Sequence, residues 1–425
     1  MTPQSPLDAW LERLESRHPQ GSNGIELGLE RVAEVRQRLP RDTNAPVILV
    51  AGTNGKGSTC AMIDAILTSA GYRVGRYSSP HLLHYNERVR IGGAPVADQA
   101  LIDAFVEVEA VRGETSLTYF EFGTLAAWSV FAANDLDAIV LEVGLGGRLD
   151  ATNIFEPACT VVTTIDIDHV QFLGPNRESI GYEKSGIFRS GVPAICGDSQ
   201  PPLSLLEQAR VTAAPLSVIG RDFGFRRLDQ QWSFWNGSRQ RSGLAFPALR
   251  GVNQLANASC AIAALEAVAA KLPVAMKDIR KGMLEVELTG RFQVLPGRPT
   301  IVLDVAHNAQ SVRALDNNLS DMAFHPATMA VFGMMADKDI DEVISLLKER
   351  VTYWLPCSLP GSRAASADFL QARLDALGAK SFGPFENPAA ALAYAQEKAN
   401  EADRILAFGS FLTVAGALEF LGRKA

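Results

Sequence analysis

The chain has 425 residues, a length that favours two domains and is enough to bury at least one full core. Hydrophobic residues make up 47% and charged residues 20%, which excludes disorder, collagen and a coiled coil as descriptions of the whole chain. The formal net charge of -7 argues against broad attraction to nucleic acid or to an anionic membrane.

The start of the chain and its apolar runs predict a cytoplasmic protein. Asp8, Glu12 and Glu15 interrupt the apolar residues of the amino terminus, which does not suit a secretory signal. No uncharged apolar run approaches the roughly 18 residues that a membrane span needs. The 5 cysteines are dispersed and form no Cys-x-x-Cys pair. We therefore expect buried free thiols in a reducing compartment, and neither a disulfide framework nor a zinc site.

The first half of the chain alternates strand-like and helix-like runs. A buried strand at Val47 to Ala51 precedes a glycine-rich turn, a helix from Ser58 to Ala70 and a second strand from Tyr72. An apolar helix is expected at Phe120 to Ala133. Further strands are expected at Ala138 to Val143, Thr160 to Ile165 and Val192 to Cys196. Strands separated by helices predict a parallel sheet.

The middle of the chain has a different pattern. Asp222 to Phe246 alternates in short strands around Asn236-Gly237, a pair that suits a tight hairpin, and predicts an antiparallel appendage. Asn253 to Leu272 then predicts a long apolar helix that Pro273 stops.

A stretch rich in glycine and proline, Gly290 to Pro299, predicts a linker. We place the boundary between two domains, 1–292 and 293–425, in this linker. Beyond it a second alternation begins, with one helix between successive strands. Its strands are expected at Ile301 to Val305, Met329 to Gly333, Tyr353 to Cys357 and Ile405 to Phe408.

The sharpest chemical signal is the segment Ala51-Gly52-Thr53-Asn54-Gly55-Lys56-Gly57-Ser58-Thr59, between a strand and a helix. Its glycines let backbone N–H groups approach phosphate oxygens, and Lys56 can reach the β- and γ-phosphates. The segment departs from the common P-loop because Val50 replaces the first glycine and Gly57 separates the lysine from the hydroxyl. The hydroxyl that faces Mg²⁺ is therefore Ser58 or Thr59. The alternative is a glycine-rich turn without nucleotide.

Polar residues also follow or end the neighbouring strands. Ser79 follows the second strand, and a hydroxyl there would face the same crevice. Glu142 lies inside an apolar strand, where an acid must be paired or bound to a cation, so it indicates either a metal or a salt bridge. His169 can ligate a metal through one ring nitrogen or be structural. Lys184, beside Glu183, has a solvated helical charge as its plain interpretation.

These motifs resemble a known family when they are taken in order. They are Gly-Thr-Asn-Gly-Lys-Gly-Ser, Ser-Ser-Pro-His-Leu, Glu-Val-Gly-Leu-Gly-Gly-Arg-Leu-Asp-Ala-Thr-Asn, Asp-His, Glu-Lys-Ser-Gly-Ile, Gly-Arg-Phe-Gln and Asp-Val-Ala-His-Asn. The set resembles the bacterial folylpolyglutamate synthase/dihydrofolate synthase enzymes of the Mur ligase superfamily, from about Leu27 to the C-terminus. The resemblance implies an α/β fold: a P-loop Mur-ligase-like parallel sheet domain followed by a smaller Rossmann-like domain.

The resemblance implies ATP and two Mg²⁺ sites. The residues implied for ATP are Asn54, Gly55, Lys56, Gly57, Ser58, Thr59, Asn257, Arg291, Asp304 and His307, with Asn253 as an alternative to Asn257. Ser79 and Glu142 would bind one Mg²⁺ and His169 the second. Lys184 matches the family's carbamylated lysine, a negatively charged metal ligand. Lys56, His169 and Lys184 are the implied catalytic residues.

The resemblance also implies the substrates, namely 7,8-dihydropteroate, folates and L-glutamate. The implied substrate-binding residues are Leu27, Gly28, Thr118, Tyr119, Phe120, Glu121, Leu149, Asp150 and Ala151. From the residues alone, Tyr119 and Phe120 would be plain core. The expected reaction is an ATP-dependent amide ligation by a monomer that is closed by its second domain. The rivals are a cell-wall Mur ligase and a non-catalytic regulatory P-loop protein.

Overall fold

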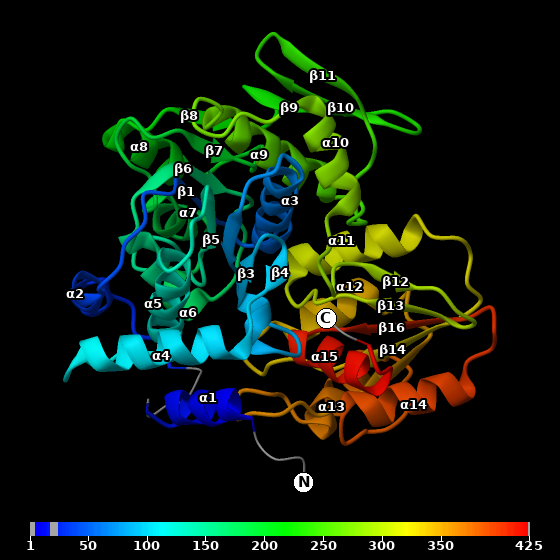
Figure 1. Ribbon diagram of the computed structural model, residues 1–425. Helices are drawn as coiled ribbons and strands as arrows, with labels where there is room; N and C mark the ends of the chain where they lie inside the picture. The colour runs from blue at the N-terminus through cyan, green and yellow to red at the C-terminus, as the bar shows by residue number, and fades with distance from the viewer. Residues whose placement is uncertain (1–4, 18–23, 424–425) are drawn as a thin grey trace. The chain divides into compact units, whose positions relative to one another are not determined.

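A computed structural model describes residues 5–17 and 24–423 (Figure 1). The chain divides into two compact units. The first consists of Met1–Pro80, Tyr85–Ala248 and Leu255–Val286, and the second of His81–His84, Leu249–Gln254 and Glu287–Ala425. Among the described residues, no helix is both long and apolar enough to cross a membrane.

The first unit is built on an 8-stranded sheet in the order β4-β3-β2-β5-β1-β6-β7-β8. Its strands are β1 Val47–Ala51, β2 Val74–Tyr77, β3 Val89–Ile91, β4 Ala94–Pro95, β5 Ala138–Glu142, β6 Pro157–Val162, β7 Ala194–Cys196 and β8 Leu216–Val218. The run from β2 to β8 is parallel, which confirms the predicted type of sheet. The pairs β2–β3 and β3–β4 are antiparallel, so the expectation of parallel strands fails at this edge.

Helices cover both faces of this sheet. They are α1 Pro6–Arg17, α2 Glu30–Arg38, α3 Lys56–Ser69, α4 Asp98–Arg112, α5 Tyr119–Ala132, α6 Val170–Leu173, α7 Arg177–Ser185, α8 Leu203–Thr212, α9 Gln254–Ala267 and α10 Met276–Glu285, with 3-10 turns at Tyr85–Arg88 and Ala151–Ile154. Val47 and Leu49 belong to a core that α4, α5, α7 and α8 share. Helix α3 packs on β1, β2 and β5 and against α10.

The buried strands have apolar residues on both faces because each face carries helices. All five residues of β1 are buried, and so are those of β5, including its last residue, Glu142. Helix α9 ends at Ala267, so the predicted helix to Leu272 is too long, and Pro273 is not what stops it.

A separate 3-stranded antiparallel sheet, β11-β10-β9, confirms the predicted appendage. Its strands are β9 Phe223–Arg227, β10 Trp232–Asn236 and β11 Arg239–Leu244. Asn236 pairs with Arg239, so the residues inside the turn are Gly237, at a φ of 55°, and Ser238. The hairpin is therefore as predicted, but Asn236 is the last strand residue before the turn.

The second unit has a 5-stranded sheet in the order β12-β13-β16-β14-β15. Its elements are β12 Gln293–Leu295, β13 Thr300–Leu303, α11 Ala309–Ser320, β14 Thr328–Phe332, α12 Ile340–Leu347, β15 Tyr353–Pro356, α13 Ala367–Ala376, α14 Pro388–Lys398, β16 Arg404–Phe408 and α15 Phe411–Phe420. Leu406 and Phe408 pack with α11, α12 and α13, whereas Ile405 and Ala407 pack with α14 and α15. This is the alternation of a strand that is covered on both faces.

Two expectations for the second unit are wrong. The stretch Gly290 to Pro299 is not only a linker, because β12 lies inside it and pairs antiparallel with β13. Two helices, α13 and α14, lie between β15 and β16 where one was expected. All five cysteines are free and buried, as predicted.

Candidate active site

Four neighbouring strands end at one edge of the first sheet and carry the predicted site residues there. The order β2-β5-β1-β6 places the segment after β2, the end of β5, the P-loop after β1 and the segment after β6 side by side. Ser79, Glu142, Lys56 and His169 come from these four segments in turn. The carboxyl ends of parallel strands are where α/β sheets bind ligands, so the arrangement predicted from the motifs is present.

The P-loop has the backbone that a phosphate cradle needs. Gly52 has a φ of 147° and Gly55 a φ of 90°, values that L side chains rarely adopt. A Cβ at Gly52 would clash with Thr163 and one at Gly55 with Asn257. The Lys56 ammonium donates to the carbonyl oxygens of Gly52, at 3.0 Å, and Thr53, at 3.3 Å. The lysine therefore lies folded over its own loop at the start of α3.

The P-loop is fastened to the segment after β6. Thr53 N–H donates to the Thr164 carbonyl at 2.7 Å, and Asn54 N–H donates to the Thr164 hydroxyl at 3.2 Å. The Thr163 hydroxyl donates to the Asn54 carbonyl at 2.6 Å. Sequence reasoning missed both threonines, although hydroxyl residues directly after a buried strand were a usable signal. Their bonds fix the loop without occupying its glycine N–H groups.

Three further predicted nucleotide residues, Asn257, Ser58 and Thr59, lie beside the loop or in the helix that follows it. Asn257, on α9, approaches Gly55 so closely that no side chain fits there, which favours it over Asn253. Ser58 and Thr59 are both buried in the first turn of α3. The Thr59 hydroxyl has no hydrogen-bond partner within the described part of the chain. A buried hydroxyl in this condition is suited to accept a ligand or metal contact.

The metal candidates come from the ends of β2, β5 and β6. Glu142 is buried at the end of β5, and Ser79 N–H donates to its Oε2 at 3.4 Å. His169 has a φ of 50°, a backbone conformation that is uncommon outside glycine and concentrates at functional sites. Asp168 accepts the His169 N–H at 2.8 Å.

In the described ranges no group of three or more His, Cys, Asp and Glu could hold a metal. The predicted set differs from such a group because it includes a serine and a modified lysine. A buried acid at a strand end that accepts from the serine backbone, together with a lysine that can become an oxygen ligand, fits Mg²⁺ by chemistry.

Lys184 is buried on α7, with 3% of its surface exposed, so its interpretation as a solvated charge is wrong. Its neighbour Glu183 pairs instead with Arg148 at 2.9 Å. Burial and, to a smaller extent, the charge of Lys56 lower the pKa of Lys184 to about 7, whereas Asp168 and Asp150 oppose the shift. Lys184 is therefore within electrostatic range of the P-loop lysine and of the segment that carries His169.

The long glycine motif after β5 packs on the end of α7. A Cβ at Gly147 would lie 2.9 Å from the Lys184 carbonyl, and Arg148 N–H donates to the Glu183 carbonyl at 2.8 Å. Asp150 directly follows Leu149, caps the 3-10 turn that begins at Ala151, and accepts the N–H groups of Leu145 at 2.9 Å and Thr152 at 3.0 Å. Burial raises the pKa of the Asp150 carboxyl, and these hydrogen bonds oppose the shift.

The predicted substrate residues come together through a residue that sequence reasoning missed. Arg31, on α2, donates to Glu121 at 3.0 Å and to the Glu26 carbonyl at 3.1 Å, which ties the stretch with Leu27 and Gly28 to α5. Thr118 and Glu121 form a capping box at the start of α5. The Glu121 carboxylate thus stabilises the start of α5 and the contact of α5 with α2.

Tyr119 and Phe120 both pack against the core of the first unit, as their plain interpretation expects. The Phe120 ring also lies 2.6 Å from where a Gly144 Cβ would be, so α5 meets the glycine motif at this point. Arg88, a second residue that was missed, lies 5.2 Å over the Tyr85 ring and 5.6 Å over the Tyr119 ring. The only feature of the sequence that could have pointed to Arg88 is that it follows Tyr85 within the same short segment.

The second unit brings its own predicted residues together. Asp304 accepts the N–H groups of Phe292, at 2.8 Å, and Ala306, at 2.7 Å. Burial raises the pKa of the Asp304 carboxyl, and the charge of Arg291 opposes the shift. Arg291 and His307 both lie by Phe411, at 5.0 Å and 6.5 Å from its ring.

The fold and the P-loop site together define a class of protein. The Mur ligase middle domain model matches residues 50–265, and the Mur ligase glutamate ligase domain model matches residues 290–411. The chain has the two-domain α/β fold of the Mur ligases and is an ATP-dependent ligase.

Individual relatives narrow this class. Proteins named dihydrofolate synthase/folylpolyglutamate synthase are 43% identical in Escherichia coli, over 100% of this chain and 98% of the relative, and 38% identical in Haemophilus influenzae, over 97% and 96%. A structure of Escherichia coli FolC in complex with DHPP and ADP superposes with a TM-score of 0.92, at 43% identity, over 99% of each chain. A Yersinia pestis bifunctional enzyme complexed with AMPPNP and Mn gives 0.90, at 44% identity, over 99% and 100%.

The chain therefore belongs to the dihydrofolate synthase/folylpolyglutamate synthase family, whose members are ATP-dependent glutamate ligases. This result favours the predicted family over a cell-wall Mur ligase and over a regulatory P-loop protein.

Proposed function

We propose that the chain joins L-glutamate to 7,8-dihydropteroate and to the γ-carboxylate of folates at the expense of ATP. The observation that carries the proposal is the buried Lys184 within electrostatic range of Lys56 and Asp168, at the edge where four strands end. The relatives' ligands support it, since solved structures of the family hold ADP with DHPP, and AMPPNP with Mn and L-glutamate.

In the proposed reaction the acceptor carboxylate attacks the γ-phosphate of ATP and gives an acyl phosphate and ADP. The glutamate amine then attacks the acyl carbon, and phosphate leaves through a tetrahedral intermediate. The charge that develops on the phosphoryl oxygens needs preorganised donors. Lys56 and the glycine N–H groups of the P-loop supply them.

The residues proposed for the nucleotide belong to both units of the chain. Phosphates rest on Asn54, Gly55, Lys56 and Gly57 with the Ser58 and Thr59 hydroxyls, whereas Asn257, Arg291, Asp304 and His307 complete the nucleotide contacts. The close approach of Asn257 to Gly55 supports its role. The charge interaction of Arg291 with Asp304 and the position of Arg291 over the Phe411 ring support a prearranged set in the second unit.

Four residues hold the metal. Ser79 and Glu142 would ligate one Mg²⁺ and His169 a second, and a carbamylated Lys184 would be a further anionic ligand. Bound Mg²⁺ neutralises phosphate charge. The chain's own contribution is to hold Glu142 at a buried strand end and to keep Lys184 in surroundings that disfavour its ammonium form.

The acceptor binds next to the glycine motif. Its pocket is made by Leu27, Gly28, Thr118, Tyr119, Phe120, Glu121, Leu149, Asp150 and Ala151. The contact of Arg31 with Glu121 and the packing of Phe120 on Gly144 support this set, because they connect its three segments. Aromatic faces suit a flat pterin ring.

We further propose a division at 1–292 and 293–425, a monomer, and a place in the cytoplasm. The division of the contacts at Val286 and Glu287 and the family matches that end at residue 265 and resume at 290 support two domains near this boundary. Five buried free cysteines support a reducing compartment.

The test is ATP-dependent phosphate release with each candidate acceptor, together with identification of the product. We expect release that depends on L-glutamate with 7,8-dihydropteroate and with a reduced folate, and products one glutamate longer. Lys56→Ala is the negative control, and it should lose on the order of 10²-fold or more in rate. Release with neither acceptor, or equal release by Lys56→Ala, would contradict the proposal.

A further inference from the structure

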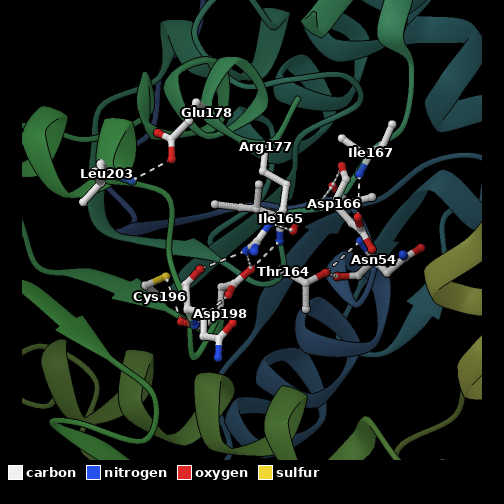
Figure 2. A network of polar contacts seen from close by, with 12 residues as sticks. Asn54, Thr164, Ile165, Asp166, Ile167, Arg177, Glu178, Cys196, Asp198 and Leu203 are labelled. Carbon is white, nitrogen blue, oxygen red and sulfur yellow. Dashed lines mark hydrogen bonds and ion pairs between the residues drawn. The ribbon is translucent and has the colours of Figure 1, made fainter. Parts of the chain in front are cut away.

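An ion pair behind the strand edge joins two elements that carry proposed site residues. Arg177 is the first residue of α7, and Asp198 follows β7 (Figure 2). Arg177 Nη2 lies 2.8 Å from Asp198 Oδ2, and the two side chains are 38% and 11% exposed. The charges of a partly exposed ion pair contribute little to stability, so the interest of this pair lies in what else the two groups hold.

Arg177 and Asp198 both form hydrogen bonds with the backbone of Ile165, in the segment after β6. Ile165 N–H donates to Asp198 Oδ2 at 3.0 Å, and Arg177 Nε donates to the Ile165 carbonyl at 3.0 Å. The second Asp198 oxygen accepts the Gln200 N–H at 2.9 Å, and Arg177 Nη2 also donates to the Gln200 carbonyl at 2.9 Å. Charge-assisted bonds to backbone groups are stronger than neutral ones, so this closed set fixes the path of the backbone at Ile165.

Both neighbours of Ile165 bond the P-loop. Thr164 accepts from Asn54 N–H (Figure 2) and from Thr53 N–H. Asp166 N–H donates to the Thr53 hydroxyl at 3.0 Å. The Thr53 hydroxyl in turn donates to the Asp166 carbonyl at 3.1 Å. A shift of Ile165 therefore moves Thr53 and Asn54, and it moves the start of the run that ends in His169.

Arg177 extends the same constraint to α7. The helix runs from Arg177 to Ser185, so its first residue is held at the ion pair while Lys184 lies in its last turn. An α-helix is rigid over this length, and anchoring one end fixes the direction of the other. The P-loop, the segment of Asp168 and His169, and the helix of Lys184 thus share one anchor.

We infer that Arg177 and Asp198 are positioning residues of the ligase reaction, which set the P-loop, His169 and Lys184 relative to one another. The inference rests on the proposed roles of these three site elements. Neither side chain touches the substrate in this scheme. An error of about 1 Å in the placement of reacting groups can cost on the order of 10²-fold in rate, so an anchor outside the site affects catalysis strongly.

The test compares Asp198→Ala with Glu178→Ala in the full-length protein. Glu178 is the matched control because it is next to Arg177 on α7 and its carboxylate also holds two backbone N–H groups, of Leu203 at 3.2 Å and Ser204 at 2.8 Å. Those bonds lead to α8 and away from the P-loop (Figure 2). For each variant we measure the melting temperature and, by calorimetry, the Mg²⁺-dependent affinity for ADP. Kinetic assays give kcat, the KM for ATP, the KM for the acceptor and the Mg²⁺ concentration at half the maximal rate.

We expect Asp198→Ala to lower kcat by about tenfold or more, to raise the Mg²⁺ requirement and to weaken ADP binding by about tenfold, with little change in the acceptor KM. Glu178→Ala should leave these quantities within about twofold of wild type. Arg177→Lys, which keeps the charge but not the two-armed contact with Ile165 and Asp198, should fall between wild type and Asp198→Ala and serves as the readout if Asp198→Ala does not fold.

Equal ADP affinity and Mg²⁺ requirement in wild type, Asp198→Ala and Arg177→Lys would overturn the inference, as would losses no larger than those of Glu178→Ala. Failure of the proposed function is a separate result, because it would be seen as absent ligation by the wild-type protein. ADP binding still reports on the anchor in that case.

Discussion

Glu183 and Lys184 are adjacent on α7 and lie in opposite surroundings. Glu183 pairs with Arg148 at 2.9 Å, whereas Lys184 is buried at the site edge with Lys56, Asp168 and Asp150 in electrostatic range. A buried ammonium is unfavourable, and one close to a cation site would repel the metal. Addition of CO₂ to the neutral amine forms a carbamate and releases a proton, which turns the side chain into an anionic oxygen ligand.

We predict that Lys184 is carbamylated in the active enzyme and that Lys184→Ala loses activity, which added acetate partly restores by occupying the vacated position. The measurements are ligation rates with and without acetate and a carbon-13 spectrum of wild type supplied with labelled bicarbonate. Lys281→Ala is the control, because that lysine is exposed and pairs only loosely with Glu285, at 3.8 Å. Full activity in Lys184→Ala, or an unmodified amine in active enzyme with Mg²⁺ bound, would contradict the prediction.

The pH dependence has a definite sign. The pKa of Lys184 is lowered to about 7, so the unmodified amine is neutral above that pH and charged below it. Carbamate formation, and with it activity, should therefore fall as the pH drops through about 7. For the unmodified protein, the unfolded chain binds the extra proton between this value and the ordinary lysine pKa, so stability rises with pH across that window.

At the scale of single residues, the sequence points to candidates that lie in dense motifs. It does not point to residues whose proposed role comes from contacts with distant parts of the chain. Lys56, Glu142 and Lys184 stand in recognisable patterns, the strand order brings the segments of Lys56 and Glu142 to one edge, and Lys184 lies within electrostatic range of Lys56. Arg31 and Asp198 stand alone in the sequence. Their importance comes from partners far along the chain, Glu121 and Ile165, which no local pattern predicts.

At the scale of elements, helix α3 has a glycine at each end with a positive φ. Gly55 precedes its first turn at 90°, and Gly71 follows its last turn at 94°. A Cβ at Gly71 would meet nothing within 4 Å, whereas one at Gly55 would clash with Asn257. Both positions therefore need a residue that tolerates a positive φ. Only at Gly55 does the missing side chain also make room for Asn257.

We predict that Gly55→Ala and Gly71→Ala both lose about 1–2 kcal/mol of stability from strain at positive φ, and that only Gly55→Ala weakens Mg²⁺-dependent ADP binding, by about tenfold or more. The added methyl group at Gly55 must displace Asn257 or the loop. Thermal unfolding and calorimetric titration with ADP are the measurements. Equal ADP affinities in the two variants would mean that the close approach of Asn257 has no part in the nucleotide site.

Which elements were predictable depended on length and burial. The strands β1 and β5 are fully buried and almost entirely apolar, and α5 is a long apolar run, so each was found within a residue or two. The short strands β4 and β12 were missed. β4 is exposed, and β12 has three residues in a stretch rich in glycine and proline, so neither has a period long enough to detect.

At the scale of the whole molecule, the division into two units was predictable only as a position along the chain. The stretch that begins at Gly290 interrupts the alternation of strands and helices, and this interruption is what made the boundary visible in the sequence. It lies close to Glu287, where the second unit resumes. Two short segments, His81–His84 and Leu249–Gln254, also belong to the second unit. They join it across long distances in sequence, which a linear division cannot represent.

The second unit holds Arg291 beside Asp304 and Phe411, an arrangement that the unit maintains by itself. Burial raises the pKa of the Asp304 carboxyl, and Arg291 opposes this shift, so loss of the guanidinium favours the protonated acid. Arg291→Ala therefore removes one charge of the proposed nucleotide site and weakens a second. The first unit shares neither residue and keeps its own core.

We accordingly predict that Arg291→Ala raises the KM for ATP and lowers the ligation rate by about tenfold or more, while far-ultraviolet circular dichroism and the main thermal transition stay close to wild type. Arg298→Ala is the matched control, since that arginine is in the same unit, is 81% exposed and pairs only with Glu401, at 3.5 Å, in the described contacts. A preorganised charge opposite a phosphate is worth far more than an exposed surface pair, so the two variants should differ clearly. Matching ATP dependence in Arg291→Ala and Arg298→Ala would show that the second unit contributes no charge to nucleotide use through Arg291.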